Sequence, residues 1–210
     1  MEDAILSLLM VSMINLGVIR ITAAAALLAL TAVLAGCSSL SEAREEASEA
    51  FGEANASIDR HNDLFAQARE TYNSVKTNIE AGEAPDEQRE DIVRARENLA
   101  EARGHLQTAR EDLARVPELT VDEPVREYAG HFIEAIDLQI AAEGREIEFY
   151  RLLEGDPALD RSRDEALDLL AEVGDGYARA EDAYRRAQDL ANENPDVIGP
   201  ATGQDAPETA

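Results

Sequence analysis

The chain contains few of the side chains on which most catalytic and metal sites depend. Its 210 residues include no Trp, a single Cys and three His. A lone Cys excludes an internal disulfide framework and a Cys-rich zinc site. There are 44 acidic and 19 basic residues, which gives a formal net charge of -25. This charge argues against nucleic acid as a partner and against docking onto anionic lipid, because both need clustered Lys and Arg.

The motifs of common enzymes are also missing. There is no Gly-x-Ser-x-Gly, no glycine-rich phosphate loop, no His-Glu-x-x-His and no calcium loop. Di-iron bundles need Glu-x-x-His, but none of His61, His105 and His131 follows a Glu at that spacing. Glu101/His105 and Glu127/His131 stand four residues apart, which favours solvated pairs, with a two-ligand surface metal site as the alternative. We therefore expect no enzyme, no cofactor and no resident metal.

Basic residues show a further bias, because Lys76 is the only Lys and the other eighteen are Arg. Acidic residues outnumber the basic ones more than twofold. Together the two biases are typical of an extreme halophile, where dense carboxylates keep a protein hydrated in concentrated salt. The composition predicts a haloarchaeal source, with an Arg-rich bacterium as the alternative.

Residues 4–36 are almost uniformly apolar and are interrupted by Arg20. They end in Leu34-Ala35-Gly36-Cys37, which resembles the lipobox of prokaryotic lipoproteins. The resemblance implies that residues 1–36 are a signal peptide, that the bond between Gly36 and Cys37 is cut, and that a lipid is attached to Cys37. It also implies a lipid-anchored protein on the extracytoplasmic face of the cell membrane.

The written start fits this scheme less well, because Glu2 and Asp3 are acidic where a signal peptide is usually positive. Starting at Met13 gives a conventional signal peptide, so we expect Met13 to be the true start. The alternative is that residues 4–36 form an uncleaved membrane anchor and that Cys37 is incidental. Both interpretations place the rest of the chain outside the cytoplasm.

After Cys37, apolar residues recur at alternating steps of three and four, which indicates helices. The pattern predicts helices over about 39–81, 86–116, 122–154 and 162–193. Ser162 and Glu165 form a capping-box pattern at the start of the last one. Short connections between long helices favour antiparallel neighbours, so we expect an all-α, up-down-up-down four-helix bundle.

The helix lengths divide the chain further. The first helix is longer than the second, so residues 37–50 are predicted to form the lipidated Cys and a helical stalk of roughly 20 Å. The bundle would then comprise residues 51–193. The Pro- and Gly-containing segment 194–210 is predicted to be a disordered tail. In the last helix, Gly174 and Gly176 are unfavourable, but the apolar positions stay in phase from Val173 to Tyr177, so we expect a continuous helix, with a kink there as the alternative.

Three polar residues fall on or beside apolar helix faces. His61 occupies a core position of the first helix, between Ile58 and Phe65. Gln139 and Glu143 lie close to the apolar face of the third helix. These three residues are candidates for a polar layer inside the bundle, although whether they meet depends on the register between the helices. Asn55-Ala56-Ser57 is a candidate N-glycosylation sequon.

These observations favour a non-enzymatic lipoprotein that acts as an envelope scaffold or protein-binding module. Its partner surface would be an interhelical groove or the distal tip, with Tyr150 and Tyr184 as contact residues. One alternative is a lipoprotein that binds a metal or small ligand in the bundle interior around His61. Another is a subunit whose Ala-rich helix faces pair with partner helices in a membrane complex.

Overall fold

The computed structural model describes residues 38–198, and this part of the chain is helical with no strand. Four long helices account for most of it: α2 (Ser38–Glu80), α3 (Arg89–Leu113), α4 (Glu123–Gly155) and α5 (Arg163–Glu193). Three short helical turns complete it: η1 (Pro85–Gln88), η2 (Val116–Glu118) and α6 (Pro195–Ile198). The predicted all-α bundle of four long helices is confirmed.

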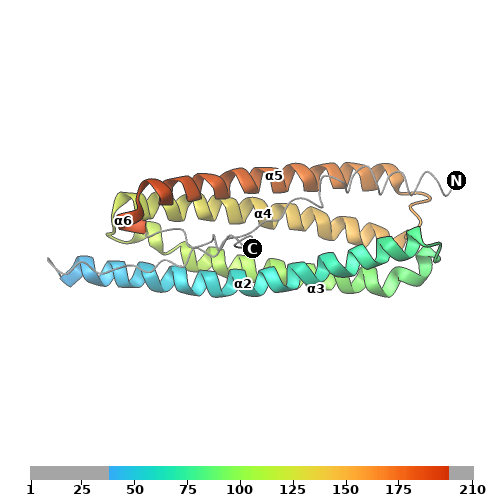
Figure 1. Ribbon diagram of the computed structural model, residues 1–210, viewed down its shortest axis with the longest axis horizontal. Coiled ribbons are helices and arrows are strands. Elements are labelled where there is room, and N and C mark those ends of the chain that lie inside the picture. Colours follow the sequence, from blue (N-terminus) through green and yellow to red (C-terminus); the bar gives the residue numbers. More distant parts are fainter. Residues whose placement is uncertain (1–37, 199–210) are drawn as a thin grey trace, which may run out of the picture.

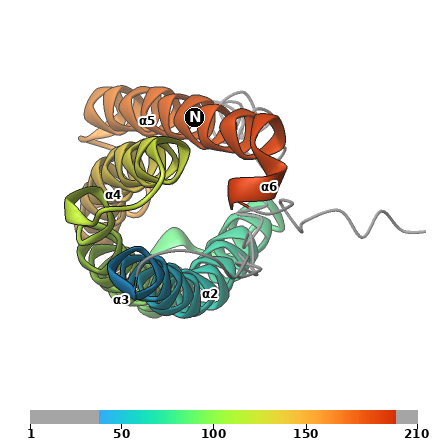
Figure 2. The same cartoon turned by 90° about the vertical axis from the view of Figure 1, so that its left-hand side faces the viewer.

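The long helices run up and down in chain order along one axis (Figure 1). Extensive packing joins α2 to α3, α3 to α4, and α4 to α5. Seen end-on, the helices follow an arc from α5 through α4 and α3 to α2 (Figure 2), and α6 contacts α4 and α5. Side chains still bridge α2 and α5 halfway along the bundle, where the rings of Phe65 and Tyr177 lie 6.1 Å apart.

The apolar core has two main parts, one toward each end of the bundle. The part near the start of α2 includes Ala54, Leu106 and Ile136, and the part near the α4–α5 turn includes Val75, Leu99 and Leu153. Alternation of Ala with larger residues lets neighbouring helices approach closely, at the cost of apolar area per residue. Between the two parts lies a zone of buried polar side chains.

Two boundaries differ from the sequence prediction. The predicted helix 86–116 starts as the tight turn η1 and ends at Leu113, and η2 follows separately. The predicted tail 194–210 begins with the helical turn α6, whose Ile198 is only 2% exposed and packs in the core. The reason is that Ile198 provides apolar area to bury, despite the Pro-rich composition around it. Residues 199–210 lie outside the described part.

The segment predicted as a stalk is largely packed. Ala47 and Ala50 are buried in the core, and Arg44 Nη2 lies 2.7 Å from Asp122 Oδ2. Counting helix lengths left residues 38–50 without a neighbour, but Ala43, Ala47 and Ala50 share a core cluster with Val121 of the connection after α3 and Val125 of α4. Only the first residues of α2, before Ala43, extend beyond the core.

The residues at the helix ends do not all form the caps that the sequence patterns predict. Ser162 precedes α5 but makes no side-chain cap to it, because its hydroxyl donates to Asp156 at 2.8 Å. Gly82 lies just after the end of α2 and has φ +94°, a conformation that favours glycine. Helix α5 runs without interruption through Gly174 and Gly176. None of the helices between residues 38 and 198 is long and apolar enough to cross a membrane.

Candidate functional site: a buried polar layer

His61 is the centre of the polar zone. Its side chain projects from α2 into the bundle, is 1% exposed, and stacks on Phe65 with ring centroids 5.4 Å apart. Nε2 lies 2.7 Å from Oε1 of Glu143 on α4, and Nδ1 lies 3.0 Å from Oδ1 of Asn62. Each ring nitrogen therefore lies within hydrogen-bond distance of a side-chain oxygen, and Nε2 also lies 3.3 Å from the amide nitrogen of Gln139.

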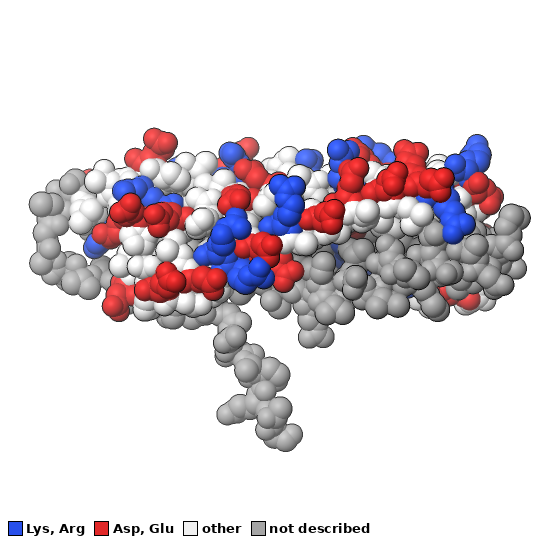
Figure 3. All heavy atoms as spheres, turned by 90° about the horizontal axis from the view of Figure 1, so that it is seen from above, with Lys and Arg blue, Asp and Glu red and all other residues white. Residues whose placement is uncertain are grey.

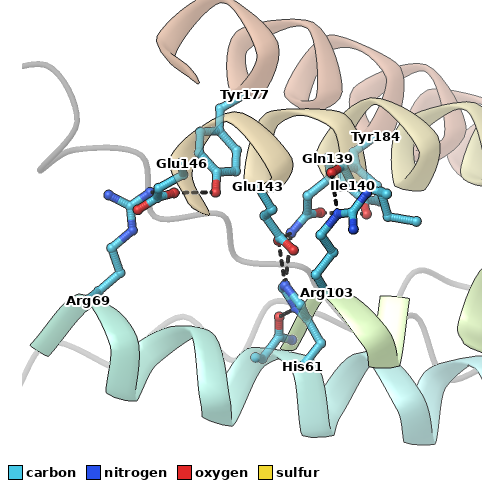
Figure 4. A network of polar contacts seen from close by, with 10 residues as sticks. His61, Arg69, Arg103, Gln139, Ile140, Glu143, Glu146, Tyr177 and Tyr184 are labelled. Atoms are coloured by element: carbon cyan, nitrogen blue, oxygen red, sulfur yellow. Dashed lines mark hydrogen bonds and ion pairs between the residues drawn. The ribbon is translucent and has the colours of Figure 1, made fainter. Parts of the chain in front are cut away.

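Glu143 has no exposed surface, and Gln139 lies one helical turn before it. The Gln139 amide nitrogen donates to Glu143 Oε1 at 3.0 Å, and its Oε1 accepts from the hydroxyl of Tyr184 at 2.8 Å. The structure thus brings His61, Gln139 and Glu143 together, and Tyr184 extends the layer to α5 (Figure 4). Three helices are joined across the interior by one chain of hydrogen bonds.

The charge of Glu143 is poorly compensated. Burial raises the pKa of its carboxyl, although the hydrogen bond and the charge of His61 pull the pKa down. Within the described structure, Oε2 of Glu143 has no hydrogen-bond partner. A buried carboxylate oxygen without a donor is costly, so the ionised form of this side chain depends on His61 and Gln139.

A second polar cluster lies beside the first, around Glu146 of α4. Its carboxylate accepts from Arg69 Nη2 at 2.9 Å, from the Tyr177 hydroxyl at 2.7 Å and from the Tyr150 hydroxyl at 2.9 Å. The Arg69 guanidinium also lies over the rings of Phe65 and Tyr177, 5.0 and 5.5 Å from their centroids. This carboxylate, unlike Glu143, has a permanent cation and two hydroxyl donors.

Sequence reasoning missed this cluster, although a signal for it was available. Gln139, Glu143, Glu146 and Tyr150 follow one another at steps of four, three and four, so they lie on one face of α4. Continuing the face from the two predicted polar residues leads directly to Glu146. Burial also raises the pKa of the Tyr150 and Tyr177 hydroxyls well above the usual value, so both stay neutral donors.

Tyr150 and Tyr184 were predicted as contact residues for a partner. Tyr150 is instead 1% exposed and donates inward to Glu146. Tyr184 is half-buried, and its hydroxyl also points inward, to Gln139. The reason is that both rings supply apolar area to the core while their hydroxyls find polar partners inside it.

The other candidate residues lie apart from this layer. Asn55 is half-buried in the middle of α2, and Ser57 of the same sequon is 5% exposed. His131 lies 3.8 Å from Glu134, which also pairs with Arg186. Among residues 38–198, no three His, Cys, Asp or Glu side chains are grouped to hold a metal ion. The predicted lipobox and the predicted cleavage position, Gly36 and Cys37, lie outside the described residues.

Comparison with known proteins adds no relative. No protein-family model matches the chain, and no curated protein or solved structure matches it at a significant level. The molecule is thus defined by its fold and interior: an all-α bundle of four long helices with a buried layer of carboxylate, imidazole, amide and phenol groups.

Proposed function

We propose that this protein is a lipid-anchored lipoprotein on the extracytoplasmic face of the cell membrane, and that its bundle is a non-enzymatic envelope scaffold or protein-binding module. The observation that carries the proposal is the position of the lipobox relative to the fold. Helix α2 begins at Ser38, directly after the candidate lipidated Cys37, and the packed core begins at Ala43. A lipid on Cys37 would therefore hold a rigid, elongated body close to the membrane.

The surface supports the same proposal and a halophilic source. Acidic side chains interleaved with Arg cover the face formed by α5 and its neighbours (Figure 3). Examples are Arg185 with Asp182 on α5, and Arg186 of α5 with Glu134 of α4. Such a surface stays hydrated in concentrated salt and would not be attracted to anionic lipid headgroups, so anchoring would depend on the lipid.

The anchor is tested by the intact mass of the protein extracted from its native membranes. We expect a chain that begins at Cys37 and carries added lipid mass. Cys37→Ser should release the protein from the membrane or leave it unprocessed and without lipid, whereas Ser38→Ala should be processed normally. A mass that includes residues 13–36 and no lipid would contradict the lipoprotein assignment.

The partner function is tested at the end of the bundle away from the anchor. The turns around Glu83 and Asp160 lie at the end opposite the start of α2 (Figure 1). A photo-crosslinking residue at Glu83 or Asp160 should give one discrete product in native membranes, and a crosslinker at Ala178, on the exposed flank of α5, should not. Equal labelling from all three positions would contradict a specific distal contact.

A second candidate function is binding of a small ligand or metal in the interior around His61. The observation in its favour is the unpartnered Oε2 of Glu143, which lies in the same layer. Native mass spectrometry of the extracted protein distinguishes the two functions. Retained mass that disappears in Glu143→Gln would favour ligand binding, whereas an unliganded chain that crosslinks from its distal end would favour the scaffold.

A further inference from the structure

Two ion pairs join α2 to α4 inside the bundle, and they differ in chemistry. Arg69 pairs with Glu146, and His61 pairs with Glu143. Arginine stays protonated at all ordinary pH values, so the first pair is permanent. An imidazole, unlike a guanidinium, exists in a neutral and a protonated form, so the second pair has no permanent cation and can change its charge.

The His61–Glu143 pair is closed off from solvent. The two side chains are 2% and 0% exposed, and Nε2 and Oε1 lie 2.7 Å apart. When the pair holds one shared proton, it is neutral overall, whether that proton is on the imidazole or on the carboxyl. When the proton is lost, a neutral imidazole faces a buried carboxylate.

The groups around the pair do not supply another positive charge to Glu143 once the shared proton is lost. The hydrogen bonds that Glu143 accepts come from His61 and Gln139, and Glu146 adds a second negative charge nearby. The remaining charged or titratable groups facing the layer are Arg69 of α2, Arg103 of α3, and Tyr177 and Tyr184 of α5. Arg69 bonds Glu146, and Arg103 Nε donates to the Ile140 carbonyl at 2.9 Å. Burial raises the pKa of both tyrosine hydroxyls, so they stay neutral.

We propose that the His61–Glu143 pair is a proton-dependent contact between α2 and α4, called the joint below. While the pair keeps one shared proton, it holds α2 against α4. When rising pH removes that proton, α2 loosens from α4. The cause is the cost of a buried charge: a carboxylate that loses its counter-charge away from water destabilises the state that buries it. Loosening exposes Glu143 to water and removes this cost.

The structure gives this loosening a place to occur. The backbone of α2 lies closest to that of α3, whereas its contacts with α4 and α5 are made by side chains, such as Tyr72 against Tyr150 and Phe65 against Tyr177. The direction also agrees with linkage. Burial raises the pKa of the Glu143 carboxyl, so the packed pair keeps its shared proton to higher pH than the same two groups do in water, and stability falls as pH rises between these two values.

Hydrogen exchange of the full chain, in detergent and molar salt, tests the joint. After correction for intrinsic exchange rates, protection of amides in residues 57–72 of α2 should fall by up to about tenfold for each pH unit between the pKa of the exposed pair and the pKa of the packed pair, and should level off above the latter. Protection in residues 92–106 of α3 should fall less. His61→Gln combined with Glu143→Gln keeps a polar pair without a titrating group, so the extra loss in α2 should disappear.

The other two histidines supply the matched control. His105→Gln with His131→Gln should leave the pH response of α2 intact. The proposal is overturned if α2 protection in the native chain is independent of pH, or if the double variant at His61 and Glu143 loses the same protection. Should that variant fail to fold, ring ¹⁵N shifts of His61 in the native chain decide. Deprotonation of His61 with no change in α2 amide signals would overturn the joint as well.

Discussion

A Cβ atom placed on Gly176 of α5 would lie 2.8 Å from Cβ and 3.3 Å from Cα of Ala142 on α4. Helices α4 and α5 therefore approach closely at this point, because one residue has no side chain and the other has the smallest one. The spacing between α2 and α5 is set differently, by Phe65 and Tyr177, whose rings fill the space between the two helices.

The two glycines of α5 should respond in opposite ways to the same substitution. Gly176→Ala should destabilise the bundle by about 1–3 kcal/mol, because its methyl group overlaps Ala142 and the helices must move apart. Gly174 has no atom within 4 Å of an added Cβ. Gly174→Ala should therefore stabilise the fold by up to about 1 kcal/mol through helix propensity. Urea unfolding at fixed salt measures the change in the free energy of unfolding for each variant. Destabilisation of equal size by the two substitutions would contradict the close contact between Gly176 and Ala142.

The buried tyrosines allow a similar comparison. The hydroxyl of Tyr72 is buried and, within the described structure, has no hydrogen-bond partner, whereas that of Tyr177 donates to Glu146 at 2.7 Å. Tyr72→Phe should leave stability unchanged or raise it, since it removes an unsatisfied polar atom. Tyr177→Phe should cost about 1–3 kcal/mol, because Glu146 loses a donor. A larger loss for Tyr72→Phe would show that its hydroxyl has a partner after all.

The turn between α4 and α5 depends on Asp156. Its carboxylate accepts from the backbone nitrogens of Asp160, Arg161 and Ser162, and from the Ser162 hydroxyl at 2.8 Å. The hydrogen bond from the Arg161 nitrogen, followed by the others, lowers the pKa of Asp156. The folded pKa lies below the unfolded value of 3.8, so this contribution is present above that value and is lost as pH falls through the folded pKa.

Asp156→Ala should therefore destabilise the protein by about 1 kcal/mol at neutral pH, like loss of a helix cap. Asp160→Ala removes the same charge four residues later, and that side chain is exposed. It serves as the control and should have little effect. Thermal unfolding of both variants from pH 7 to pH 3 measures the difference, which should shrink with acidification. A constant difference would contradict a role for the ionised carboxylate.

Salt should stabilise this protein. Acidic side chains exceed basic ones 44 to 19, so repulsion among unpaired carboxylates outweighs attraction in pairs such as Arg185–Asp182. Screening shortens from about 10 Å at 0.1 M salt to about 3 Å at 1 M. The urea midpoint should rise over this range of KCl, and sucrose of matched osmolarity controls for general exclusion effects. A midpoint independent of KCl would argue against adaptation to concentrated salt.

The helices themselves follow from the sequence. Apolar steps of three and four predicted four long helices, and α2 and α4 start and end within a residue of the predicted positions. The same periodicity placed His61 on the inner face of α2 and Gln139 and Glu143 beside the inner face of α4. Periodicity reports which face of a helix is buried, because that depends on the chain alone.

Contacts between helices needed the tertiary structure. Whether His61 meets Glu143 depends on how far α2 slides along α4, and no local pattern determines that register. Arg69 was missed because it lies beside the apolar face of α2 and reaches inward with a long side chain, a behaviour that burial patterns do not reveal. The packing of Ala47 and Ala50 was missed because the helix-length argument considered α3 alone, whereas their core cluster also includes Val121 of the connection and Val125 of α4.

The sequence by itself determined the number of long helices, the bounds of α2 and α4, the inner faces of the helices, and the excess of acid. It also carries the lipobox pattern from which the membrane anchor is proposed. Only the tertiary structure decided which buried polar groups pair, that Glu146 has a permanent cation while Glu143 depends on His61, and how closely each helix pair approaches. The physical reason is that periodicity acts within one helix, whereas pairing of charges depends on distances between helices.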